Sequence, residues 1–161
     1  MRRVLHAGCG TEPLPALFVD SDEVRLDADP SVGPDIVASF TDLGDIGEFD
    51  DIWCAHAIEH LHPIDVIKAL KEFLRVLKPG GACLVAVPDL EGVAPTFDPL
   101  PGQVVCGHDL IYGRNDTYSN PWMLHRTGFI EGTLRGAMLK AGFPFVHIKR
   151  TDYTLVGIGT K

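Results

Sequence analysis

The chain has 161 residues, of which 45% are hydrophobic and 22% are charged, and this length and composition are typical of one globular domain. Its 22 acidic residues outnumber its 14 basic residues and give a net charge of −8, which disfavours a nucleic-acid partner because a polyanion would be repelled at long range. Since no apolar run approaches the roughly 20 residues of a membrane span and no export signal is visible at the start, we expect a cytoplasmic protein with no membrane partner.

Five apolar runs of strand length follow one another through the first 90 residues, with turn signals between them. They are continuous rather than alternating, which is typical of parallel strands covered on both faces. Only 13 residues, Thr11 to Glu23, join the first two runs, too few for a full crossover helix and both of its turns. The five predicted strands cover residues 3–8, 23–29, 34–40, 49–55 and 81–89.

A helix is predicted between the fourth and fifth strands. Apolar residues recur every three or four positions from Val66 to Leu77, and residues 78–81, Lys-Pro-Gly-Gly, provide a stop. A second helix begins near residue 127 and ends at Gly142. The last two runs, residues 145–152 and 153–161, are too close together for a helical crossover, so they must pair antiparallel.

The predicted fold is therefore α/β and Rossmann-like, a doubly wound, mostly parallel seven-stranded sheet that an antiparallel C-terminal hairpin closes. No helix is predicted before the first strand, so we expect the fold to be truncated at the N-terminus. Residues 1–161 are expected to form one domain. Residues 91–127 are proline-rich with weak periodicity and are predicted to be an irregular insertion, because loops of this length are usually lids or binding segments.

Two features at the predicted strand ends indicate a ligand site. Gly8 and Gly10 follow the first strand directly, and in open parallel sheets ligands approach glycine-containing backbone beyond the carboxyl ends of the strands. Asp27 ends the second strand, 17 residues after Gly10, where a carboxylate can accept both hydroxyl groups of a ribose. Either feature alone could be a tight turn or a solvated aspartate, so the prediction depends on the pair.

The chain resembles the class I S-adenosylmethionine-dependent methyltransferases, and in particular their small type 11 group. The matching segments occur in the expected order and span nearly the whole chain: VLHAGCG, LDADP, DIVASFTDL, FDDIWCAHAIEHL, LKPGG and AGF. The resemblance implies an enzyme that transfers a methyl group from S-adenosylmethionine to a small or medium-sized acceptor. A homo-oligomer is compatible with it.

The resemblance also implies a role for individual residues in binding the cofactor. The glycine turn would line the methionine part, the acid and its neighbour would bind the ribose, the loop after the third strand would flank the adenine, and the end of the fourth strand would face the sulfonium. In this order, the residues are His6, Ala7, Gly8 and Gly10; Asp27 and Ala28; Phe40 and Thr41; and Cys54 and Ala55.

Acceptor binding and proton transfer have weaker candidates. His56 follows the fourth strand and is the first candidate for a general base, because a neutral imidazole titrates in the required range; a helix-start residue bonded to backbone is the competing interpretation. The insertion is the best candidate for acceptor binding, because functional side chains often lie on loops. Its candidate residues, any of which could instead be a plain surface residue, are His108, Tyr112, His125 and Arg126.

His56, Glu59 and His60 have the H-x-x-E-H spacing of the inverted zinc-protease motif. That motif needs both histidines and the glutamate on one regular helix, with a further ligand from elsewhere. Here the segment falls at the exit of the fourth strand, and Pro63 disfavours a helical conformation at His62. We therefore expect no metal site, and a metallohydrolase is the less favoured hypothesis.

The main alternative is a non-catalytic cofactor-binding or interaction protein with a degenerate methyltransferase fold. His6 and Ser39 stand where the family usually carries acids, and the short first crossover leaves a thin pocket wall. Such a protein would bind the cofactor weakly or not at all. A nicotinamide enzyme is disfavoured because the third glycine of the dinucleotide fingerprint is missing.

Overall fold

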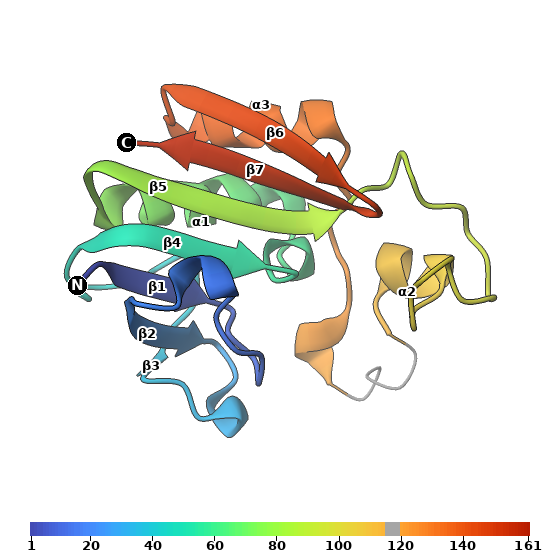
Figure 1. The fold of residues 1–161 in the computed structure, drawn as a ribbon, viewed down its shortest axis with the longest axis horizontal. Helices are drawn as coiled ribbons and strands as arrows, with labels where there is room; N and C mark the ends of the chain where they lie inside the picture. Colours follow the sequence, from blue (N-terminus) through green and yellow to red (C-terminus); the bar gives the residue numbers. More distant parts are fainter. Residues whose placement is uncertain (115–119) are drawn as a thin grey trace.

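The computed structural model describes residues 1–114 and 120–161, and its centre is a seven-stranded sheet (Figure 1). The strands lie in the order β3-β2-β1-β4-β5-β7-β6. Strands β1 to β5 run parallel, and β7 lies antiparallel between β5 and β6. Their bounds are β1 Arg3–Ala7, β2 Asp22–Asp27, β3 Ile36–Val37, β4 Phe49–Ala55, β5 Leu77–Pro88, β6 Phe145–Thr151 and β7 Thr154–Thr160.

This sheet confirms the predicted fold class, mostly parallel and closed by a C-terminal hairpin, but two strands differ from the prediction by more than two residues at one end. The third strand is only two residues long, although residues 34–40 were expected. The fifth strand begins at Leu77 and includes residues 78–81, which we expected to form a turn. Its pairing with β4 shifts register at this point, which is how the extra residues are accommodated.

The two long helices lie side by side behind the sheet (Figure 1). They are α1, Pro63–Val76, and α3, Glu131–Ala141. As predicted, the second of them ends at Gly142, which has a φ of 111°. The apolar face of α1 buries Leu70 and Phe73 completely in the main core. Full burial of such a side chain contributes roughly 1.5 to 3 kcal/mol, so this face fixes the helix on the sheet.

The opposite face of the sheet has a thinner cover. The connection from β1 to β2 forms only a short 3-10 helix, η1 (Ala16–Phe18), which agrees with the expectation of no full crossover helix there. Phe18 packs against Trp53 of β4, with ring centroids 6.2 Å apart. Doubly wound sheets carry helices on both faces, so this layer is reduced.

The segment between β5 and α3 extends beyond the carboxyl ends of the parallel strands (Figure 1). We predicted an irregular insertion over residues 91–127, but the described part contains a helix, α2 (Gly107–Tyr112), and a 3-10 helix, η5 (Pro121–Met123). A bridge between Asp89 and Phe129 closes the base of the segment. The insertion therefore stands at the edge of the sheet where ligands bind in such folds.

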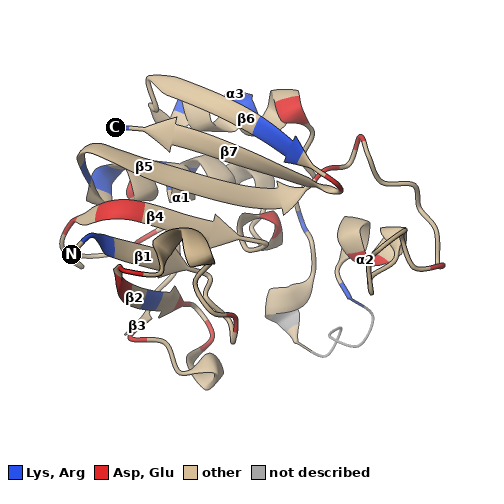
Figure 2. Ribbon diagram, in the orientation of Figure 1, with Lys and Arg blue, Asp and Glu red and all other residues tan. Residues whose placement is uncertain are grey.

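The charged residues of the described part are spread over several elements. Figure 2 shows lysine and arginine on strands and helices without a single basic stripe, while acidic residues occupy many of the loops. None of the helices in residues 1–114 and 120–161 is both long enough and apolar enough to cross a membrane.

Candidate functional site

The first strand ends in the predicted glycine turn. The amides of Gly8 and Cys9 both donate to the carbonyl oxygen of Leu26, at 2.8 and 3.2 Å, and so fasten the turn to the end of β2. Gly8 has a φ of 69°, and a Cβ placed there would lie 2.4 Å from the Cβ of Ala57. Gly10 has a φ of 47° and open space beside it. The turn is thus tightly packed at Gly8 and accessible at Gly10.

Asp27 lies against this turn, as predicted. Its Oδ2 accepts a hydrogen bond from the Gly10 amide at 2.9 Å, and its Oδ1 accepts one from the Asp29 amide at 2.9 Å. Each carboxylate oxygen has two lone pairs, so each retains one for a ligand hydroxyl. Ala28 is half-buried between these two acids. A fixed carboxylate beside open glycine backbone fits the ribose end of S-adenosylmethionine.

His6, on β1 just before the turn, is a buried polar residue. Only 3% of the residue is exposed, and its Nδ1 lies 2.7 Å from Glu23 Oε1. Arg25 lies 3.4 Å from the same Glu23 oxygen and donates from Nη2 to the carbonyl oxygen of Gly10 at 2.7 Å. This cluster supports the turn through Arg25. A contact between His6 and a cofactor stays a prediction, and the buried ring leaves little surface for it.

The remaining predicted cofactor residues surround the glycine turn. The ring of Phe40 lies beside Gly8, since a Cβ there would be 3.0 Å from Phe40 Cζ. Ala7 pairs with Cys54 across β1 and β4. Burial raises the pKa of the Cys54 thiol well above its usual range, so this thiol is not an activated nucleophile. Two further predicted residues are half-buried, in the loop after β3 and at the end of β4: Thr41 and Ala55.

His56 turns the chain out of β4. Its φ of 49° is uncommon for a residue other than glycine, and its side chain is half-exposed. The carboxylate of Glu59, whose Oε1 lies 3.5 Å from His56 Nδ1, raises the pKa of the His56 imidazole. The glutamate belongs to a 3-10 helix, η3 (Ile58–His60), and α1 begins only at Pro63. As we predicted, the H-x-x-E-H segment is not part of one regular helix.

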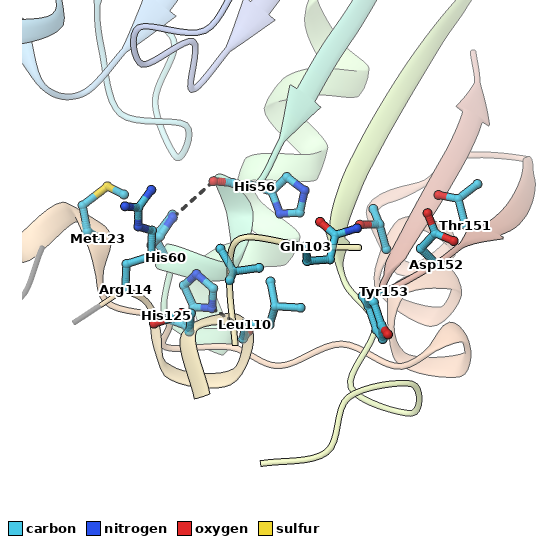
Figure 3. Close-up of a pocket in the computed structure, with 13 residues that line it drawn as sticks. His56, His60, Gln103, Leu110, Arg114, Met123, His125, Thr151, Asp152 and Tyr153 are labelled. Carbon is cyan, nitrogen blue, oxygen red and sulfur yellow. Dashed lines mark hydrogen bonds between the residues drawn. The ribbon is translucent and has the colours of Figure 1, made fainter. Parts of the chain in front are cut away.

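A cavity of about 370 Å³ opens beside His56, between the insertion and the turn of the β6–β7 hairpin. Figure 3 shows imidazoles from η3 and from the insertion on one side and side chains of the hairpin turn on the other. This volume suits a small-molecule ligand. Its lining residues include His56, His60, Gln103, His125, Asp152 and Tyr153.

The structure brings one of the four predicted acceptor residues to this cavity. His125 lines it, and burial lowers the pKa of its imidazole. His108 instead stacks on Phe97, with ring centroids 4.0 Å apart. Tyr112 is 53% exposed, and neither it nor Arg126 is part of the cavity wall. Acceptor contacts by these three residues stay predictions that the position of the cavity does not favour.

Sequence reasoning missed the contribution of the hairpin turn. Asp152 and Tyr153 lie between β6 and β7 and line the cavity. A signal was available, because a hairpin whose second strand pairs antiparallel with the last parallel strand must place its turn at the carboxyl edge of that sheet. Gln103 also lines the cavity, but nothing in its sequence surroundings points to it.

Similarity to known proteins also indicates a methyltransferase. A family model described as a methyltransferase domain matches residues 5–85, just over half of the chain. The chain belongs to the methyltransferase-domain family. This confirms the predicted family, for which S-adenosylmethionine is the methyl donor. Among curated proteins, none matches this methyltransferase-domain chain.

Solved methyltransferases share the fold at low sequence identity. An S-adenosylmethionine-dependent methyltransferase from Archaeoglobus fulgidus aligns with 99% of this chain and 86% of its own, with a TM-score of 0.66 and 15% identity. The Burkholderia thailandensis 1,6-didemethyltoxoflavin-N1-methyltransferase, solved with 1,6-didemethyltoxoflavin and S-adenosylhomocysteine, aligns with 99% of this chain and 71% of its own, at 0.65 and 19%. A candidate O-methyltransferase from Nostoc punctiforme gives 0.66 and 12% over 99% of this chain, which spans only 52% of that protein. At these identities the matches show the fold.

Proposed function

We propose that this chain transfers a methyl group from S-adenosylmethionine to a small or medium-sized acceptor that binds in the cavity beside His56. The observation that carries the proposal is the contact between Gly10 and Asp27. It lies at the carboxyl ends of β1 and β2, and the adjacent strand β4 leads to His56 and the cavity. A nucleotide site and an acceptor site are thus neighbours on one edge of the sheet.

When bound, S-adenosylmethionine supplies a methyl group on a sulfonium, and the protein's task is mainly to align the acceptor with it and to exclude water. Asp27 would bind the ribose hydroxyls, and the open backbone at Gly10 would admit the rest of the cofactor. His56 stays the candidate general base, because it lines the cavity at the end of β4. Location in the cytoplasm and a homo-oligomeric state stay predictions.

A calorimetric titration of the purified protein with S-adenosylmethionine and S-adenosylhomocysteine tests the proposal. We expect binding that Asp27→Asn weakens at least 10-fold, because two charge-assisted hydrogen bonds to the ribose are lost. Asp20→Asn is the matched control, since it removes the same charge from an exposed residue outside the site. Equal binding by wild type and Asp27→Asn would contradict the assigned ribose site.

The second candidate, a non-catalytic cofactor-binding or interaction protein, is favoured by the surroundings of His6. The acid usual in the family is replaced there by a histidine that is already paired with Glu23, and the layer over that face of the sheet is thin. The titration separates the candidates. Absence of binding at millimolar cofactor would favour this second role, and binding followed by methylation in an acceptor screen would rule it out.

A further inference from the structure

Two imidazoles in the wall of the cavity lie close to one buried carboxylate behind it, at a place where we expected no metal site from the sequence. Glu59 and His60 come from η3, and His125 comes from the end of the insertion. One ligand atom from each of the three residues lies within 4.8 Å of the others. His56 stands next to them, with Nδ1 3.5 Å from Glu59 Oε1.

Glu59 is the residue that most needs an explanation. Only 1% of it is exposed, and within the described part of the chain neither of its carboxylate oxygens has a hydrogen-bond partner. Its main chain is held firmly, because the amides of Arg126 and Thr127 donate to its carbonyl oxygen at 2.8 and 3.0 Å. A buried carboxylate without hydrogen bonds is costly unless a cation compensates its charge. The fold therefore fixes a buried carboxylate that has no hydrogen bond from the described residues, with His56 Nδ1 as an ion-pair neighbour at 3.5 Å.

Both histidines have a nitrogen that can serve as a ligand. His125 Nδ1 donates to the carbonyl oxygen of Leu110 at 2.9 Å, which leaves Nε2 with its lone pair, and Figure 3 shows this second nitrogen turned towards His60. The two nitrogens of His60 each lie 3.2 Å from a carbonyl oxygen, one of Leu124 and one of His56. A neutral imidazole can donate to only one of them. Histidine-to-carbonyl bonds of this kind orient the ring in metal sites.

We propose that Glu59, His60 and His125 bind a divalent transition-metal ion, with Zn²⁺ as the best fit. Two imidazoles and one carboxylate form a donor set that zinc accepts while keeping a position open. Ligand atoms about 2.1 Å from one ion lie at most about 4.2 Å apart, so side-chain movements of roughly 1 Å bring the three onto a single ion.

The consequence for acceptor binding rests on the proposed function. His60 and His125 both line the cavity, so an open position on the ion faces the place where the acceptor would bind. An acceptor with an oxygen that can ligate the ion, such as a hydroxyl or a carboxylate, suits this position best. The binding of zinc itself does not depend on methyl transfer, and the two ideas can therefore fail separately.

The competing explanation is a simple ion pair between Glu59 and a protonated His56. Their atoms are 3.5 Å apart, and half of the His56 side chain is exposed, whereas only 1% of the Glu59 side chain is. The two explanations differ for Glu59→Gln. If Glu59 is a metal ligand, neutralising its carboxylate should leave the melting temperature of the metal-free protein unchanged or raise it. If it is held by an ion pair, the melting temperature should fall.

The experiment is a zinc titration of the chelator-treated 161-residue chain by calorimetry, with the melting temperature measured with and without zinc. We expect one equivalent of Zn²⁺ to bind and to raise the melting temperature. Glu59→Gln and His125→Ala should each weaken zinc binding at least about 100-fold, because each removes one of three ligands. His62→Ala is the matched control, because it removes an exposed histidine two positions from His60 and should bind zinc like the wild type.

Three outcomes would overturn the proposal: no zinc binding at micromolar concentrations, binding that survives Glu59→Gln and His125→Ala, or binding that is lost in His62→Ala. A lower metal-free melting temperature for Glu59→Gln together with no zinc response would establish the ion pair instead. If His125→Ala fails to fold, His125→Gln tests the same ligand with a side chain of closer size.

Discussion

At the scale of single residues, Gly8 has less room around it than Gly10, the other glycine of the turn. Its φ of 69° is one that side chains rarely adopt, and a Cβ there would lie 2.4 Å from the Cβ of Ala57. Ala57 directly follows His56, so the close contact joins the glycine turn to the exit of β4. Packing against Ala57 is therefore sufficient to explain the glycine at this position.

Gly8→Ala should lower the free energy of unfolding by about 2 to 4 kcal/mol, because left-handed strain and overpacking add together. Gly33→Ala is a matched control, since Gly33 has a φ of 66° but open space around it, and it should lose only about 1 kcal/mol. Chemical denaturation of both variants measures the difference. Equal losses would show that Ala57 moves aside without cost.

At the scale of elements, α1 is tied to the loop before β4 by one charged pair. Glu72 Oε2 accepts a hydrogen bond from the amide of Leu43 at 2.9 Å, and Arg75 donates to the carbonyl oxygen of Gly44 at 2.8 Å. The two side chains also form an ion pair at 2.7 Å. The hydrogen bond from Arg75 lowers the pKa of the Glu72 carboxyl below its usual 4.5.

A carboxyl whose pKa is lowered by folding stabilises the protein above its unfolded pKa, and this contribution is lost as the pH falls through the folded value. Glu72→Gln should therefore cost about 1 kcal/mol at pH 7, a modest figure because the pair is partly solvated. The difference from wild type should shrink as the pH falls below about 4.5. Urea denaturation at pH 7 and pH 3.5 measures the free energy of unfolding of both proteins. If the difference between them is the same at both pH values, the effect of Glu72→Gln comes from packing and not from charge.

The elements themselves could be predicted because their signals are local. The period of α1, the stop at Gly142 and the short hairpin connection each depend on neighbouring residues, and the structure agrees with all three. The short length of β3 and the presence of α2 were not predicted. The length of β3 depends on its pairing at the edge of the sheet, and α2 depends on contacts with a part of the chain distant in sequence. Gly10 and Asp27 were predicted as a pair because parallel strands bring their carboxyl ends together.

The cluster around Glu59 could not be predicted in the same way. His125 reaches it because the next two residues of the insertion pair by backbone hydrogen bonds with the Glu59 carbonyl oxygen. Such pairing uses backbone groups that nearly all residues have, so no pattern of side chains in the sequence indicates it. The H-x-x-E-H spacing includes Glu59 and His60 of this cluster but not His125, and the segment does not lie on the single regular helix that the zinc-protease motif requires.

At the scale of the whole molecule, the sheet and the insertion differ in how they are held. Cys54 and Cys83 lie on the central strands β4 and β5 with no exposed surface, and burial raises the pKa of both thiols. Cys106 lies in the insertion and is 9% exposed. Segments outside the core often open locally with less free energy than the whole domain, so these cysteines can report on two kinds of opening.

We expect iodoacetamide to modify Cys106 under native conditions at least 10-fold faster than Cys54 or Cys83, because the central strands become accessible only when the sheet unfolds. Alkylation at increasing urea, followed by mass spectrometry of the peptides, measures each rate. The two strand cysteines should respond to urea with the slope of global unfolding, and Cys106 with a smaller slope. One common rate and slope for all three would mean that the insertion unfolds together with the sheet, and that it cannot open over the cavity as a separate lid.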